Sequence, residues 1–540
     1  MATNRRSDRE VTELNRRQAL TLLGGAGSAA MLAGCQDIGD DDGDGSTLHV
    51  QLGGSLDSLD PQLAGLRNTQ VVVNRVVEKL FEPDLEMEMQ PVLAEEYELT
   101  DDGGSVIIQL REGVQFHPPY EREMVAEDVV YNFDRVSDPD TGSPRQDNFD
   151  NLEDWYAEGD HELRIDFEEP EPALEATLAN TGMHILSPDA LEEEGDASSH
   201  PVGTGPFAFE EWVTRDYIHL VAHDEYWVDG VPGVEEVYFR PIEEPATAIT
   251  EIQEGEIEML HDVPLDNVGQ LEDDDDVEVQ FVEAPDLRFR MMVNASDNEI
   301  DGRAPGAPTQ SQNIRQAIAE AIDQEDFVEI AAGGHAEVGQ TVYPEDNVWG
   351  VDYQPFSVNA DPDRARELIE ESEFDEPVEL TMISASDEDD LRTLGQLAQD
   401  QLNDAGFEVD LEEMEIASWV ERLNAFEWDI TPNHGSHSPD PALKRFERMF
   451  WTDEENVPYY DSPDSNADRV FEIFEEDSTD LSQEERYELY AEFQRLLCDD
   501  AVYLICCHPQ NAHALRTYVE DFEIHPMDMY FPVHNARLEH

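Results

Sequence analysis

The chain has 540 residues, with 128 Asp and Glu against 31 Lys and Arg, and a formal net charge of −97. No basic stripe is available to meet phosphates, so nucleic acid is excluded as a partner. An apolar fraction of 39%, with 7 Trp, 16 Tyr and 22 Phe, indicates packed cores rather than disorder. At molar salt the Debye length falls to about 3 Å, so the composition predicts a halophilic surface whose self-repulsion is screened.

The first 34 residues have the pattern of an export signal. Arg16-Arg17 precedes an apolar run, 19–33, that is shorter than the roughly 20 residues of a bilayer span. This order is similar to a twin-arginine signal peptide, and L-A-G-C at 32–35 resembles a lipobox that would place a lipid on Cys35. The alternative is a buried, Gly-rich helix of a cytosolic domain. Residues 35–46 then form an acidic tether, which predicts a protein held on the extracellular face of the cell membrane.

From residue 47 onward, strand and helix patterns interleave, which predicts α/β domains. Asp361 is expected as a helix N-cap with Pro362 after it, and Gly406 as a C′ residue. The expected strands are 47–52, 105–110, 163–167 and 407–411, and the expected helices are 70–80, 126–136, 247–257, 313–322, 362–371 and 391–405.

Several stretches occur in the order found in one family. They are SLDSLDPQLA (55–64) with VVEKLFEPD (76–84), 91–117 with AEDVVYNFDRV (126–136), PVGTGPFAFEEW (201–212) with HDEYW (223–227), NIRQAIAEAIDQEDFV (313–328), and DPDRARELIEES (361–372). The chain resembles the extracellular solute-binding proteins of peptide/nickel-type ABC importers, which include oligopeptide- and dipeptide-binding proteins, here as a lipoprotein of haloarchaeal type.

This resemblance implies a bilobal fold of the periplasmic-binding-protein kind, in which two α/β lobes joined by a hinge close on a ligand. Lobe I would comprise 47–84, 200–290 and 505–540, with an inserted subdomain over 85–199, and lobe II would comprise 291–504. It also implies a monomeric, non-enzymatic receptor that needs no cofactor and delivers its ligand to the permease subunits of a transporter. A di- or oligopeptide is the default ligand of the family.

The stretch EWDITPNHGSHSPDPALKRF at 427–446 carries the first group of candidate ligand residues. In peptide-binding relatives an Asp four residues before the Pro of a D/E-P pair holds the ligand's ammonium group. Alignment on Asp440 and the proline after it places His437 there, and a neutral imidazole does not replace a carboxylate. His434 and His437 instead offer hydrogen bonds to a sugar or nitrogen ligands to a metal chelate, so both remain alternatives to a peptide. Trp428 is a candidate pocket aromatic, although the sequence favours core packing for it.

The loop at 65–70 carries the second group, because it corresponds to a ligand-facing region of relatives. Arg67, Asn68 and Thr69 are the candidates, and the Arg67 guanidinium is suited to a carboxylate or phosphate. The alternative for Arg67 is a surface ion pair.

Two further motifs are interpreted as structural. GTGPF at 203–207 lacks the lysine of a phosphate-binding loop and is expected as a turn within a lobe. Cys506 and Cys507 lie in an apolar, strand-like run, so core packing is expected. The rival function from another class is a secreted hydrolase that uses these thiols.

Overall fold

The computed structural model describes residues 47–54, 56, 58–64, 67–100, 103–149, 151–168, 171, 174–283, 288–296, 307–345, 347, 349–435, 460, 462–476 and 481–539. The side chain of Arg67 is not among the described parts. The export signal, Cys35, the tether, His437 and Asp440 all lie outside the described residues.

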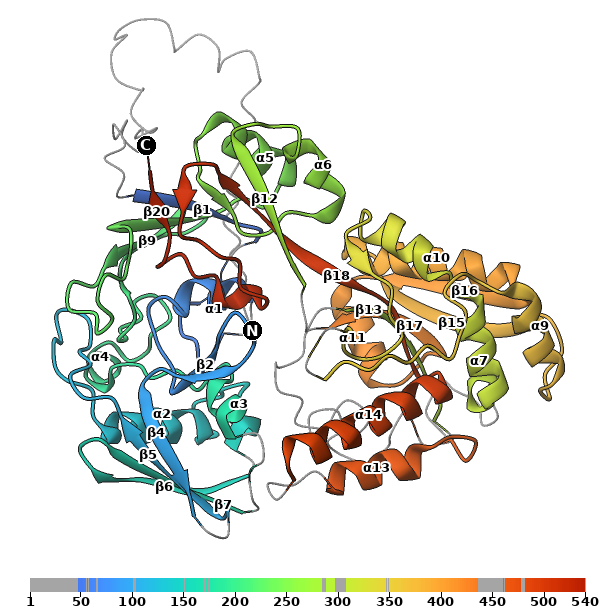
Figure 1. The fold of residues 1–540 in the computed structure, drawn as a ribbon, viewed down its shortest axis with the longest axis horizontal. Helices are drawn as coiled ribbons and strands as arrows, with labels where there is room; N and C mark the ends of the chain where they lie inside the picture. Colours follow the sequence, from blue (N-terminus) through green and yellow to red (C-terminus); the bar gives the residue numbers. More distant parts are fainter. Residues whose placement is uncertain are drawn as a thin grey trace, which may run out of the picture. The chain divides into compact units, whose positions relative to one another are not determined.

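A twelve-stranded mixed sheet runs through the described chain, and β18 (Tyr503–Arg516) is its longest strand. β18 pairs antiparallel with β13 near its start and with β12 over its second half, as Figure 1 shows. The strand order is β16 (Phe407–Met414), β15 (Val378–Ala385), β17 (Ile430–Gly435), β13 (Arg288–Val293), β18, β11 (Met259–Leu260), β1 (Thr47–Leu52), β10 (Glu236–Pro241), β9 (Tyr217–Ala222) and β8 (Phe207–Val213), with β12 (Val277–Glu283) and β14 (Ala336–Glu337) also on β18. We call β16 to β13 the β15 half of the sheet, and β11 to β8 the β1 half.

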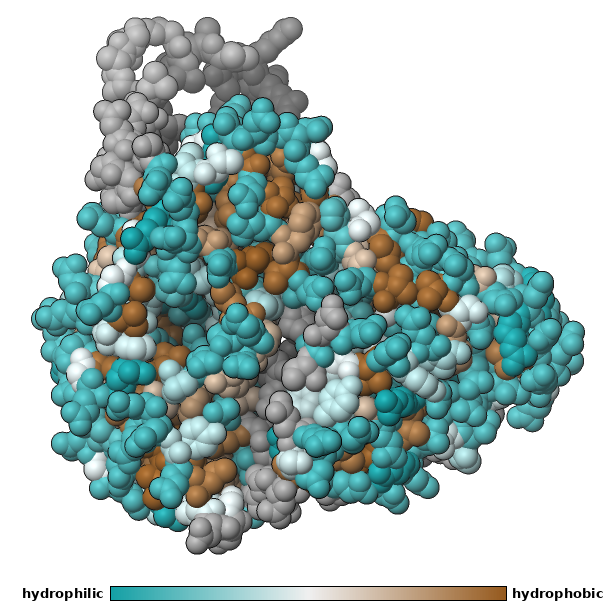
Figure 2. All heavy atoms as spheres, viewed as in Figure 1, coloured by the Kyte–Doolittle hydropathy of each residue, from teal (hydrophilic) through white to brown (hydrophobic). Residues whose placement is uncertain are grey.

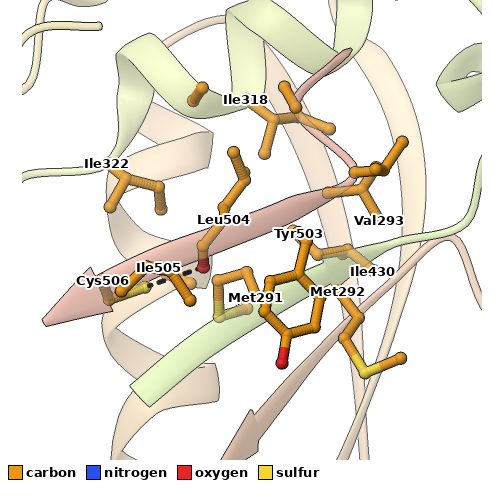
Figure 3. Close-up of a cluster of buried hydrophobic side chains, with 14 of the residues drawn as sticks. Met291, Met292, Val293, Ile318, Ile322, Ile430, Tyr503, Leu504, Ile505 and Cys506 are labelled. Carbon is orange, nitrogen blue, oxygen red and sulfur yellow. Dashed lines mark hydrogen bonds between the residues drawn. The ribbon is translucent and has the colours of Figure 1, made fainter. Parts of the chain in front are cut away.

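The β15 half has its own core, covered by helices. Figure 3 shows Ile318 of α7, and Ile322 directly after this helix, near Leu504 of β18. The helices are α7 (Gln312–Ala321), α8 (Gln324–Asp326), α9 (Pro362–Glu370), α10 (Asp389–Asp404), α11 (Ile416–Asn424), α13 (Ala467–Glu476) and α14 (Gln483–Asp500), with short turns η3 (Pro308–Gln310) and η4 (Phe327–Ala331). Asp361 caps α9 as expected, because its carboxylate accepts the Arg364 N–H at 2.9 Å.

The β1 half has a second core, to which the C-terminal segment contributes. Its strands β1, β10 and β11 are parallel, and Leu48, Val50 and Leu52 of β1 are buried. The elements around it are α1 (Arg67–Val73), α4 (Pro188–Glu194), α5 (Pro245–Glu254), η2 (Leu265–Asn267), α6 (Val268–Leu271), β19 (Val519–Glu520), η5 (Asp528–Tyr530) and β20 (Arg537–Leu538).

A separate four-stranded antiparallel sheet and a third core lie within residues 80–185. The sheet order is β4 (Ala94–Leu99), β5 (Ser105–Leu110), β7 (Glu162–Phe167) and β6 (Leu152–Gly159). The other elements are the hairpin of β2 (Phe81–Pro83) and β3 (Met89–Pro91), and α2 (Ala126–Ser137), η1 (Gln146–Phe149) and α3 (Leu174–Ala179).

Most expected elements are confirmed, but the helix expected over 70–80 is wrong beyond Val73, where α1 ends. The carbonyl of Arg75 accepts the Phe207 N–H at 3.1 Å, and that of Val76 accepts the Gly205 N–H at 3.0 Å. These carbonyls are the acceptors that a continued helix would need. The GTGPF stretch therefore ends the helix by taking its hydrogen bonds, which a periodicity of apolar residues does not reveal.

Three of the family stretches, 76–84, 201–212 and 223–227, meet at one carboxyl group, Glu78. It accepts hydrogen bonds from Thr204 Oγ1 at 2.8 Å, Tyr226 Oη at 2.9 Å and Trp227 Nε1 at 3.1 Å. Burial outweighs these bonds and raises the pKa of Glu78 to about 7. A Cβ on Gly203 would lie 2.3 Å from the Val76 carbonyl oxygen, so this glycine is required by close packing. GTGPF is thus the structural turn that its sequence predicts.

The surface of the described residues is mainly hydrophilic on the face in Figure 2. Among the described helices, none combines the length and apolar character that a bilayer crossing requires.

Candidate ligand-binding site

The end of β17 positions the first predicted group. In register with β13, Asn433 lies opposite Arg290 and His434 opposite Phe289. Arg290 is buried, donates from Nη2 to Asn433 Oδ1 at 2.7 Å, and stacks over the Tyr503 ring with its Cζ 4.6 Å from the centroid. His434 is exposed at the strand end. His437 and Asp440 follow in the sequence but lie outside the described residues, so their ligand contacts stay a prediction.

Trp428 lies in the core of the β15 half, not on a surface open to a ligand. It is 2% exposed, and its Nε1 donates to the Leu423 carbonyl at 3.1 Å. The indole N–H is therefore satisfied by the protein itself. In this arrangement, the packing alternative describes the residue.

The second predicted group lies at the start of α1. Thr69 is buried, and its hydroxyl donates to the Ser58 carbonyl at 3.0 Å, which connects the start of α1 to residue 58. Asn68 is half-buried, and its Nδ2 lies 2.8 Å from the position of a Cβ on Gly54. A glycine at 54 thus lets the Asn68 side chain approach the loop that follows β1.

Gln70, the next residue, was not among the sequence candidates. It is 3% exposed, and within the described chain neither Oε1 nor Nε2 has a hydrogen-bond partner. A buried amide without partners is rare and calls for an explanation. The sequence offered one signal for Gln70, which is its position directly before the apolar run VVV at 71–73.

Histidines form a third polar group near the carboxyl end of β11. His261 is 2% exposed, with Nε2 3.2 Å from the Asp528 carbonyl oxygen. Its ring centroid lies 5.3 Å from that of His513 on β18 and 4.8 Å from that of Phe531. Its Nδ1 has no hydrogen-bond partner in the described part of the chain. Asp262, which follows, is exposed close to Gly53 at the end of β1.

These residues share a topological position. β1 and β11 are parallel, so Gly53 and His261 both follow the carboxyl ends of neighbouring strands. In open α/β sheets, ligands bind outside the carboxyl ends of strands. The arrangement can supply amide, imidazole and carboxylate groups for hydrogen bonding, and nothing in it resembles a nucleophile activated by a base.

The cysteines do not provide such a nucleophile. Cys506 and Cys507 are fully buried in the core of the β15 half, where Figure 3 shows Cys506 beside Ile505. Burial raises the pKa of the Cys507 thiol to about 12 and raises that of Cys506 as well. Their prediction as core residues is confirmed. Within the described ranges, no cluster of three or more His, Cys, Asp or Glu could hold a metal ion.

Residues 88–455 match the family described as bacterial extracellular solute-binding proteins, family 5 Middle. The chain belongs to this family. It is similar to the glutathione-binding protein GsiB of Shigella flexneri, with 26% identity over 462 residues, which are 81% of this chain and 85% of GsiB.

Solved structures of similar fold cover nearly all of this family 5 protein. CtaP, an ABC transporter substrate-binding protein of Listeria monocytogenes, has a TM-score of 0.78 at 21% identity, over 92% of this chain and 99% of CtaP. DppA from Helicobacter pylori, in complex with the peptide STSA, has a TM-score of 0.74 at 22% identity, over 92% and 98%. The α/β, bilobal fold class is confirmed, and so is the class of function, a solute-binding protein of ABC importers. The residue limits of lobes and subdomain stay a prediction.

Proposed function

We propose that this family 5 protein captures a di- or oligopeptide between its two lobes and delivers it to the permease of an ABC importer. It acts as a monomeric receptor without catalytic activity or cofactor. Lobe I comprises 47–84, 200–290 and 505–540, lobe II comprises 291–504, and 85–199 is an insertion in lobe I. The energy for transport comes from nucleotide hydrolysis by the transporter.

The observation that carries the peptide assignment is the unpartnered amide of Gln70. A side-chain amide offers one acceptor oxygen and an NH₂ donor, and a peptide unit offers the complementary N–H and C=O. A ligand with peptide bonds would therefore satisfy both atoms together. The names of GsiB and of the DppA complex, a glutathione-binding protein and a peptide complex, support the same ligand class.

The charged ends of a peptide also find suitable groups. Arg290 presents a guanidinium, the group best suited to a carboxylate. Asp262, exposed beside the end of β1, supplies a carboxylate for an ammonium group. This position would compensate for His437, which stands where peptide-binding relatives have an aspartate.

We propose further that Arg67, Asn68, His434, His437 and Asp440 border the same ligand, and that residues 1–34 direct twin-arginine export. Cys35 then carries the lipid that holds the protein on the extracellular face of the membrane, with 36–46 as tether. Cys35→Ser is expected to release the exported protein into the medium, and Arg16→Lys with Arg17→Lys to block export. Mass spectrometry of the mature N-terminus measures the lipid directly. An unmodified Cys35 on the exported protein would contradict the anchor.

The ligand class is tested on the full chain purified at molar salt. Native mass spectrometry identifies a ligand that co-purifies, and calorimetry then measures binding of the tetrapeptide Ser-Thr-Ser-Ala and of reduced glutathione. We expect saturable binding of at least one of them, with compaction in small-angle scattering and weaker binding by His437→Ala at unchanged stability. Binding of maltotriose or a nickel–histidine chelate in their place overturns the peptide assignment. Binding without compaction contradicts capture between lobes.

The hydrolase alternative has its own test. Cys506 and Cys507 are expected to resist alkylation in the native protein and to react only after unfolding. Turnover of peptide or ester substrates that is lost on alkylation would contradict a receptor without catalytic activity.

A further inference from the structure

A hollow of about 390 Å³ opens beside the C-terminal segment and is lined by other residues than those assigned above. Its walls come from residues 75–85, after α1, and from residues 521–535 of the C-terminal segment. The two segments are joined by His525, whose Nδ1 accepts the Met527 N–H at 2.9 Å and whose Nε2 donates to the Pro83 carbonyl at 3.1 Å. None of the described ligand candidates lines it. A volume in this range is that of a small-molecule site.

A buried guanidinium faces this hollow. Arg75 is 3% exposed and lines it, and its Nη1 donates to His534 Nδ1 at 2.7 Å. His534 therefore accepts on Nδ1 and is neutral, and burial beside Arg75 holds its pKa well below the usual range. Within the described residues, Arg75 Nε has no hydrogen-bond partner and no carboxylate forms a direct ion pair with the guanidinium, although the charges of Glu82 and Glu78 act on it from further away. A buried charge without a counter-ion is costly, so this group favours an anionic partner.

Two of the four acidic residues around the hollow are already neutralised by their own cations. Glu82 Oε1 lies 3.6 Å from Nζ of Lys79, a buried lysine. Asp521 Oδ2 lies 3.2 Å from Nε of Arg537. Each of these two carboxylates therefore has a closer cation than Arg75.

The other two acidic residues differ from each other. Asp84 accepts on Oδ1 from the Glu86 and Glu88 N–H groups at 3.0 and 2.9 Å, and on Oδ2 from Gln90 Nε2 at 2.7 Å. Glu523 is exposed and forms no hydrogen bond or ion pair with the described residues. The hollow thus presents one guanidinium without a directly bonded carboxylate and one carboxylate free of partners among the described residues.

We propose that this hollow binds a small zwitterion of the free α-amino acid class, with its carboxylate on Arg75 and its ammonium group directed to Glu523. A simple anion would pair with Arg75 but would be repelled by the carboxylates at the edge of the hollow. A simple cation would be attracted by these carboxylates but would leave Arg75 unpaired. Only a ligand with both charges complements both groups. Because the walls come from residues 75–85 and 521–535, and none from 291–504, binding requires no closure of the two lobes.

The test compares L-alanine with two analogues, each of which lacks one of its two charged groups. L-Alanine carries both groups, propionate lacks the ammonium, and ethylammonium lacks the carboxylate. Binding to the full chain is measured by saturation-transfer NMR and calorimetry in molar KCl. We expect saturable binding of alanine and roughly tenfold weaker binding, or none, of the other two. Equal binding of propionate, or no saturable binding of alanine at millimolar concentrations, overturns the proposal.

Variants locate the binding. Glu523→Gln changes an exposed side chain and is expected to weaken alanine binding about fivefold at unchanged unfolding midpoint. Glu520→Gln, also exposed and on the neighbouring strand β19, is the matched control and should leave binding unchanged. Arg75→Gln should abolish binding, with circular dichroism as the check on folding.

Binding at the transport site is distinguished by His437→Ala and Gln70→Leu. These variants should weaken peptide binding and leave alanine binding intact. If they abolish alanine binding while Glu523→Gln does not, alanine occupies the transport site and the proposed hollow is refuted. The failure of peptide binding alone would refute only the proposed function.

Discussion

Glu78 shows how burial and hydrogen bonds compete at a single residue. Three side-chain donors favour its carboxylate, yet burial dominates and raises its pKa to about 7. Between the unperturbed pKa of 4.5 and about 7, the folded state therefore binds more protons at Glu78 than the unfolded state. The free energy of unfolding consequently contains a contribution that is full below pH 4.5 and lost as the pH rises through about 7.

We predict that Glu78→Gln removes this contribution. The difference in unfolding free energy between native protein and variant should change by roughly 3 kcal/mol between pH 4 and pH 8, at about 1.4 kcal/mol per unit of pKa. Denaturant unfolding at constant molar salt measures it. Glu127→Gln, at an exposed position of α2, is the control and should show no such change. A pH-independent difference for Glu78→Gln would contradict the raised pKa.

Gln70 and Thr69 are adjacent but differ in what they bond. Because the Gln70 amide has no partner in the described chain, Gln70→Leu should leave stability unchanged or raise it by about 1 kcal/mol. The same variant should weaken peptide binding about fivefold to tenfold, the loss of a hydrogen bond of about 1 kcal/mol. Calorimetry and thermal unfolding measure the two effects.

Thr69→Val serves as the comparison, since it removes the bond to the Ser58 carbonyl. It should lower the free energy of unfolding by about 1 kcal/mol. If Gln70→Leu destabilises the protein and leaves peptide affinity unchanged, the amide is structural and the assignment of this residue to the site is wrong.

At the scale of elements, the end of α1 is set by a segment more than a hundred residues away. Gly205 and Phe207 donate to carbonyls of residues 75–76, and Gly203 packs directly on Val76. The apolar spacing of 70–80 is that of a helix, but this competing set of hydrogen bonds wins beyond Val73. The irregular segment after α1 positions Arg75 at the hollow and Glu78 beside its three hydrogen-bond donors.

We predict that Gly203→Ala destabilises the protein by about 3 kcal/mol or more, because its Cβ would meet the Val76 carbonyl oxygen at 2.3 Å. Gly255→Ala is the control: its φ is +78°, but a Cβ there has open space, so about 1 kcal/mol is expected. Urea unfolding measures both. Equal losses would show that close packing at 203 is not limiting.

For the whole molecule, the dominant property is its charge of −97. Self-repulsion of this magnitude opposes the compact state, and added salt shortens the Debye length from about 10 Å at 0.1 M to about 3 Å at 1 M. We therefore predict that the thermal unfolding midpoint rises steeply with KCl over this range. Sucrose at matched osmolality, which does not screen charge, should produce a much smaller rise. A midpoint independent of KCl would contradict a halophilic protein.

Local patterns in the sequence determined most of the elements, the α/β class and the family, because caps, alternation and ordered motifs act over a few residues. They also indicated that GTGPF is structural and that Cys506 and Cys507 are core residues. They did not locate the end of α1 at Val73, they left Trp428 open between pocket and core, and they did not single out Gln70. Only the tertiary structure decided these, because each depends on residues far away in the chain. They are Phe207 for the Arg75 carbonyl, the whole core for Trp428, and, for the amide of Gln70, the lack of a partner among the described residues. Burial and pairing are properties of the packed molecule, and no spacing of residues along the chain contains them.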